Sequence, residues 1–167
     1  MVNAGVVFAD FVEKELKAER ERRVSLEARG LGVLTTSGTL VTLIFALGAL
    51  VTGVDKFELD TASLWPLAGA LLAFVVAAFL GLLANRLRRY EVTQPAQLHE
   101  WRDRDGAWND TADKARRVVT RANILTLASL RQGNNAKADL VDAALWAQLT
   151  AVLLLAASVG TAVLAAI

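Results

Sequence analysis

The sequence contains no cysteine, one histidine and two prolines among its 167 residues. Without cysteine the chain can form no disulfide and no thiolate metal site, and it cannot be palmitoylated. The single histidine, His99, has neither a second histidine nor a cysteine with which to share a metal ion. The motifs of zinc hydrolases, of nucleophile-elbow hydrolases and of phosphate-binding loops are also missing. We therefore predict no catalytic residues, no metal, no cofactor and no enzyme activity.

Charged residues are missing from three long stretches, 30–54, 61–85 and 143–167, although 21% of the chain is charged. At a rise of about 1.5 Å per residue, a helix over such a stretch reaches roughly 37 Å, more than the roughly 30 Å of a bilayer's hydrocarbon core. We therefore predict an all-α integral membrane protein, a helical bundle in which these three stretches are the transmembrane helices.

The distribution of lysine and arginine predicts the orientation. Six lie in the arm 1–29, eleven in 86–142 and one in 55–60. The positive-inside rule then puts the amino terminus in the cytoplasm and the carboxyl terminus outside. The cytoplasmic extensions are an amphipathic helix at 1–29, a loop at 86–110 and a helix at 111–142. Tyr90 and Trp146 are expected to mark the cytoplasmic boundary of the membrane, as interfacial aromatics do.

Small residues recur in the first span at alternating steps of three and four. This seam allows helix backbones to approach closely in lipid, and such packing is the more usual role of small residues in membranes. Its hydroxyl groups could instead line a pore in a ring of subunits. The members of the seam are Gly32, Thr35, Thr39, Thr42, Ala46, Ala49 and Gly53.

The second span carries a ladder of small residues at strict four-residue steps, which is typical of close helix crossings. Its members are Gly69, Ala73, Ala77, Gly81 and Asn85. A different row, alternating by three and four, passes through Gly133, Ala136, Leu140, Ala143 and Ala147. Because this row crosses Gly133 unbroken, we predict one long helix in which Gly133 is a close-contact glycine. A kink at Gly133 is the alternative.

Two surfaces of the predicted cytoplasmic part are candidates for contact with a ligand or with another helix. Lys114, Arg117 and Arg121, joined by Arg116, form a basic face that could hold a phosphate-bearing ligand or anionic lipid headgroups. Nearby aspartates favour an ordinary charged surface instead. In the arm, an apolar stripe is expected to pack on another cytoplasmic helix; it consists of Phe8, Phe11, Val12 and Leu16.

The order of these parts resembles the small transmembrane effectors of bacterial nucleotide-signalled antiphage systems, the Pycsar effectors and the related SLATT proteins. The likeness is carried by residues 26–38, LEARGLGVLTTSG, and by residues 131–137, RQGNNAK. The resemblance implies a bacterial inner-membrane protein that forms oligomers and permeabilises the membrane in response to a signal. It transfers no functional residue.

Two functions follow as hypotheses. The first is a homo-oligomeric inner-membrane protein that acts as a regulated pore or membrane-disrupting effector. Antiphage defence is the candidate role of such an effector. The second is a non-catalytic membrane scaffold or accessory subunit that docks a protein partner. The expected partners are membrane lipid, further copies of the chain and a nucleotide signal or a protein, with no nucleic acid.

Overall fold

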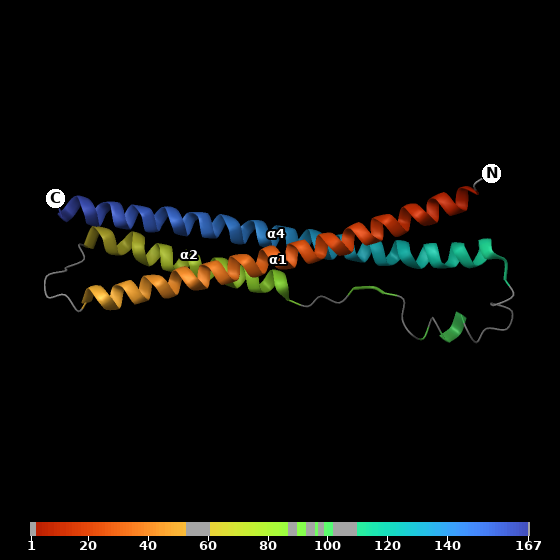
Figure 1. Cartoon of the computed structure of the whole chain (residues 1–167), viewed down its shortest axis with the longest axis horizontal. Coiled ribbons are helices and arrows are strands. Elements are labelled where there is room, and N and C mark those ends of the chain that lie inside the picture. The colour runs from red at the N-terminus through yellow and green to blue at the C-terminus, as the bar shows by residue number, and fades with distance from the viewer. Residues whose placement is uncertain are drawn as a thin grey trace. The chain divides into compact units, whose positions relative to one another are not determined.

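The computed structural model of the protein describes residues 3–52, 61–86, 90–92, 96, 99–101 and 110–166. Three long helices account for most of them: α1 (Ala4–Thr52), α2 (Thr61–Asn85) and α4 (Ala112–Ala166), shown in Figure 1. No strand occurs among these described residues. The predicted all-α class is therefore confirmed.

All three helices are long and apolar enough to cross a membrane, judged by length and composition. The qualifying segments lie within Ala4–Ala46, Ala62–Asn85 and Ala112–Leu164. The second predicted span coincides with α2. The other two are the later parts of α1 and α4, because the charged segments before them continue into them without a break. Residues 53–60, which include Gly53 of the predicted seam, lie outside the described ranges, as does much of the predicted loop 86–110.

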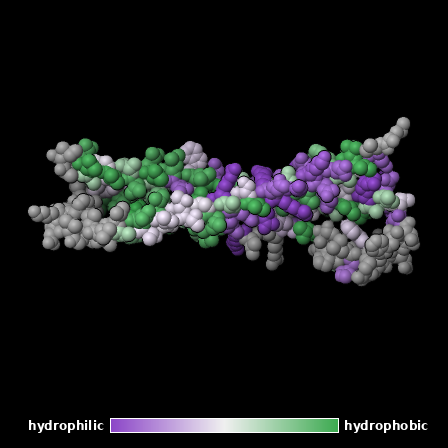
Figure 2. Space-filling view, in the orientation of Figure 1, coloured by the Kyte–Doolittle hydropathy of each residue, from purple (hydrophilic) through white to green (hydrophobic). Residues whose placement is uncertain are grey.

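The chain divides into two compact units. Unit 1 comprises residues 1–25 and 87–136, and unit 2 comprises residues 26–86 and 137–167. Both α1 and α4 thus contribute their first part to unit 1 and their last part to unit 2. Figure 2 shows apolar residues covering much of unit 2, whereas unit 1 carries many hydrophilic residues.

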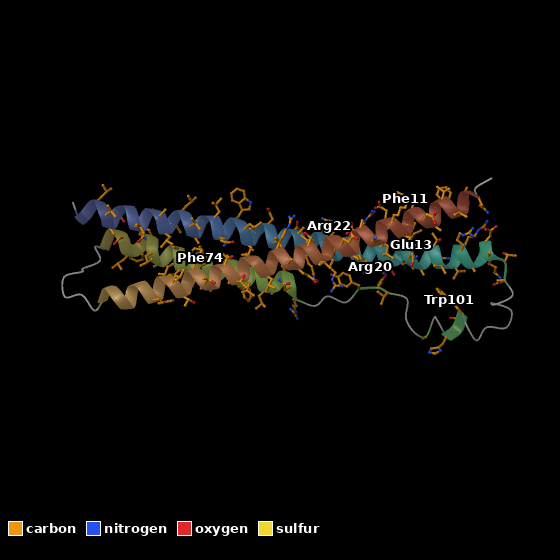
Figure 3. The ribbon with its side chains drawn as sticks, in the orientation of Figure 1. Phe11, Glu13, Arg20, Arg22, Phe74 and Trp101 are labelled. Atoms are coloured by element: carbon orange, nitrogen blue, oxygen red, sulfur yellow. The ribbon has the colours of Figure 1, made fainter. Side chains whose placement is uncertain are left out.

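Unit 2 is a three-helix bundle in which α2 runs antiparallel to α1 and α4 (Figure 1). Its largest fully buried side chain is Phe74, labelled on α2 in Figure 3. Val33, Ala77 and Ala144 form a buried cluster with one member from each helix. The Ser158 hydroxyl donates a hydrogen bond of 2.8 Å to the Ser63 carbonyl oxygen, which ties α4 to the start of α2. Most of these side chains are small, so the backbones come close.

The closest of these approaches joins Gly81 of α2 to Gly30 of α1. A Cβ atom placed on Gly81 would lie 2.7 Å from the Gly30 carbonyl oxygen. At the other end of the ladder, a Cβ on Gly69 would lie 3.2 Å from Leu154 of α4. Four-residue steps advance by about 40° around a helix, at about 100° per residue. The ladder therefore begins on the α4 side of α2 and ends on the α1 side.

Unit 1 contains a parallel pair formed by α1 and α4. Leu16 packs with Leu127 and Leu130, and the ring of Tyr90 covers this cluster. A Cβ on Gly133 would lie 2.5 Å from Tyr90 Cε1, so the glycine makes room for the ring. The Tyr90 ring thus packs inside unit 1, and its position at the cytoplasmic boundary of the membrane stays a prediction. This packing also explains why α4 continues through Gly133 as one helix, since ring contacts offset a glycine penalty of about 1 kcal/mol.

The apolar stripe predicted in the arm is only half buried. Val12 and Leu16 lie in the core of unit 1, whereas Phe8 and Phe11 remain 67% and 62% exposed. Figure 3 shows Phe11 on the outward side of α1. The α4 row predicted from the sequence is only partly buried: its members Thr126 and Gly133 are buried, whereas Ala143 is exposed. The other buried residues of α4 lie one position further toward the carboxyl terminus, at Leu127, Leu130, Asn134, Lys137, Val141, Ala144, Ala151 and Ser158.

We predict that Gly81→Ala destabilises the protein by about 1–3 kcal/mol, because the added methyl group meets a backbone oxygen that cannot move independently of α1. Gly38→Ala is the matched control, since a Cβ there has nothing within 4 Å. Thermal unfolding in detergent measures both. Equal melting temperatures for the two variants would contradict the close contact.

Candidate functional site

The predicted seam of span one lies on the outward side of α1 in unit 2. Gly32, Thr35, Thr39, Thr42 and Ala46 are all exposed. A Cβ on Gly32 would meet no atom within 4 Å. The side chain of Ala49, like Gly53, is outside the described part of the chain. The described part of the seam is therefore exposed and not buried within the bundle.

The buried face of α1 lies on the opposite side of the helix. Val33 is 4% exposed and Ser37 is fully buried. At about 100° per residue, Thr35 and Thr39 are each displaced by roughly 160° from Ser37. Ser37 and its neighbours thus make the contacts within the bundle, and the threonines face away from it. Among the described residues the Ser37 hydroxyl has no hydrogen-bond partner, so it is a buried polar atom without compensation.

The threonine hydroxyls donate their hydrogen bonds to their own helix. Thr39 Oγ1 lies 2.9 Å from the Thr35 carbonyl oxygen, and Thr42 Oγ1 lies 2.9 Å from that of Gly38. Thr35 Oγ1 lies 3.0 Å from the carbonyl oxygens of both Leu31 and Gly32. Because the donors are used internally, the surface offers oxygen lone pairs, which accept hydrogen bonds and attract cations. We call this surface, Gly32, Thr35, Thr39, Thr42 and Ala46, the hydroxyl stripe.

A polar cluster joins α1 to α4 in unit 1. Asn134 is fully buried, and its Nδ2 lies 2.8 Å from both the carbonyl oxygen and Oε2 of Glu19. Arg131 pairs with Glu15 and also approaches Glu19, its Nε lying 3.6 Å from Oε1. A buried asparagine in a parallel helix pair fixes the register, because any shift would take its Nδ2 away from Glu19. The buried Oδ1 of Asn134 has no partner among the described residues. Sequence reasoning missed this cluster, although Asn134 stands at a core position of a 3.5-residue repeat.

A second buried polar group lies in unit 2. The Lys137 side chain is only 1% exposed, and its ammonium group pairs with the carboxylate of Glu27, which is about one third exposed. The two residues come just before the charge-free parts of α4 and α1. The sequence placed Lys137 and Glu27 in charged segments that were expected to be solvated and cytoplasmic. Their pairing was therefore not predicted. Burial of the lysine makes the pair a constraint on α1 and α4 within unit 2.

The structure separates the arginines of the predicted basic face from its lysine. Arg117 and Arg121 line a cavity in unit 1 together with Arg116. Lys114 does not line it; its Nζ lies 2.8 Å from Asp110 Oδ1. Among the described residues, no group of three or more histidine, aspartate or glutamate side chains could hold a metal ion.

Comparisons with protein-family models, with curated proteins and with solved structures find no match to this chain.

We predict that Glu27→Gln destabilises the protein more than Lys137→Met does. The first substitution leaves a buried ammonium group without its counter-charge, which costs about 2 kcal/mol or more, whereas methionine fills the same space without charge. Thermal unfolding of both single variants and of the double variant measures the coupling. The pair has no structural role if Glu27→Gln melts at the wild-type temperature.

Proposed function

We propose that the protein is a multi-pass protein of the bacterial inner membrane that assembles from several copies and permeabilises the membrane as a regulated pore. Its amino terminus is cytoplasmic and its carboxyl terminus extracytoplasmic, in keeping with the positive-inside rule. Three spans give this arrangement, because an odd number of crossings leaves the two ends on opposite sides.

The observation that carries this proposal is the outward position of the hydroxyl stripe. A row of small residues permits close helix contact, yet the described part of the hydroxyl stripe is exposed and is not buried against another helix of the same chain. A second copy of α1 could use it, either by packing on it or by placing it around a central channel. The face of α1 used inside the bundle is a separate one, so assembly needs no rearrangement of unit 2.

The chemistry of the stripe suits a channel lining. In lipid the hydroxyls would gain nothing beyond the bonds they already make to their own helix. Around a water-filled channel, the same oxygens accept hydrogen bonds from water and help to hydrate a cation. Beyond these threonines, Ala46 makes the stripe apolar, which is the character that a hydrophobic constriction needs.

The second candidate function, a scaffold that docks a protein partner, is favoured by the exposed apolar residues of unit 1. Val7, Phe8 and Phe11 are each more than half exposed on α1. Exposed aromatic residues of this kind are enriched where proteins bind one another. A partner that co-purifies at a fixed ratio with a monomeric or dimeric chain in detergent would favour this function over the pore.

We predict that Thr39→Leu or Ala46→Leu changes ion leakage from liposomes by about tenfold or more, because leucine on the stripe fills the space that a channel or a close contact needs. Thr36→Leu is the control for an added leucine on α1: Thr36 is also exposed and lies beside the stripe, about 100° from Thr35 and about 60° from Thr39.

Native mass in detergent completes this test. The proposal requires a defined assembly of several copies, and leakage that depends on it. A monomer at all protein concentrations, with liposomes that stay sealed, would contradict the proposed function.

A further inference from the structure

Unit 1 contains a cavity of about 510 Å³ between the start of α1 and the start of α4. The α1 side contributes Asn3, Ala4, Gly5 and Phe8. The α4 side contributes three arginines within two turns, Arg116, Arg117 and Arg121, together with Asp113, Thr120 and Ile124. All of these residues belong to the same compact unit.

The amino terminus of α1 faces this cavity. Asn3 caps the helix: its Oδ1 accepts a hydrogen bond of 2.9 Å from the Gly5 backbone N–H. The first turn of α1 contains no acidic residue, so no side chain of that turn neutralises the positive end of the helix dipole. Arg116 is close by, since a Cβ on Gly5 would lie 4.0 Å from its Nη1.

The charges of the lining are not balanced. Asp113 is its only acidic residue, and it already accepts hydrogen bonds from Arg116 at 3.0 Å and from Asn3 at 3.3 and 3.4 Å. Arg117 and Arg121 have no hydrogen-bond or ion-pair partner in the part of the chain that the structure describes. They are four residues apart, so they stand one above the other on α4. Two guanidinium groups thus remain available at the cavity.

We propose that this cavity binds a phosphate-bearing ligand. Guanidinium groups bind phosphate oxygens through paired, charge-assisted hydrogen bonds, and a helix amino terminus adds backbone dipoles of the same sign. The Thr120 hydroxyl can donate a further bond. Phe8 and Ile124 form an apolar wall, so the ligand carries an apolar or aromatic group beside its phosphate. A soluble phosphate compound and a lipid headgroup share this chemistry.

The site is independent of the proposed pore, because every residue that lines it belongs to unit 1 and the hydroxyl stripe belongs to unit 2. Binding can therefore be present in a protein that conducts nothing, and leakage can persist when binding is lost. Lys114 does not line the cavity, so Lys114→Gln provides a control on the same helix that removes a positive charge outside the site.

Binding is tested on the full chain in detergent, with pyrophosphate and adenosine triphosphate as soluble probes in calorimetry. Native mass spectrometry measures the lipid that the protein retains after exposure to one of two lipid preparations. The first is phosphatidylcholine alone, and the second contains about a quarter phosphatidylglycerol, whose negative charge attracts basic surfaces. The variants are Arg117→Gln with Arg121→Gln, and Lys114→Gln as control. A melting temperature within the range of the control shows that the double variant is folded.

We expect saturable binding of one probe class that weakens about tenfold or more in the double variant, as expected for loss of charge-assisted bonds, and that changes less than about twofold in Lys114→Gln. Binding of the soluble probes alone identifies a free phosphate compound, and selective retention of phosphatidylglycerol alone identifies a lipid headgroup. The proposal is overturned if neither probe binds saturably, or if Lys114→Gln weakens binding as much as the double variant.

Discussion

The close contact between Gly30 and Gly81 is the constraint on which unit 2 depends. Lipid tails are as apolar as leucine side chains, so no hydrophobic force gathers helices within a bilayer. Dispersion contacts between surfaces that fit closely must hold them instead, and these contacts weaken steeply with separation. Two glycines allow the backbones of α1 and α2 to approach each other directly, and the small residues Ala77 and Ala144 extend the fit to α4. A single methyl group at this crossing would therefore act on the whole bundle.

Buried polar residues supply the specificity that small residues cannot. Rows of alanine and glycine pack almost equally well after a shift of one helical turn, because their surfaces are alike. In unit 1, the buried Asn134 donates hydrogen bonds to Glu19, and in unit 2, the buried Lys137 pairs with Glu27. Each unit therefore has its own polar contact that fixes α1 against α4. We regard these contacts as the reason why the two long helices keep one alignment.

The first span of α1 has two faces with different surroundings. Val33 and Ser37 face the bundle, while the hydroxyl stripe faces away and satisfies its donors within the helix. Such a division lets one chain fold by itself and still present a surface for further copies. The basic cavity of unit 1 would let a second chemistry, the binding of phosphate, act on the same long helices, since α1 and α4 pass through both units.

The sequence by itself determined the number of apolar helices and the position of their charge-free parts, because runs without charge and the bilayer thickness leave few alternatives. It favoured a continuous α4 over a kink at Gly133, and it predicted a 3.5-residue period for this helix. Only the tertiary structure decided which faces are buried: most buried residues of α4 lie one position beyond the predicted row, and the described part of the α1 seam faces away from the bundle. Small residues have little preference for one face of a helix, and lipid does not distinguish inside from outside as water does. Tyr90 shows the same limit, since its contact with Gly133 joins residues far apart in the chain.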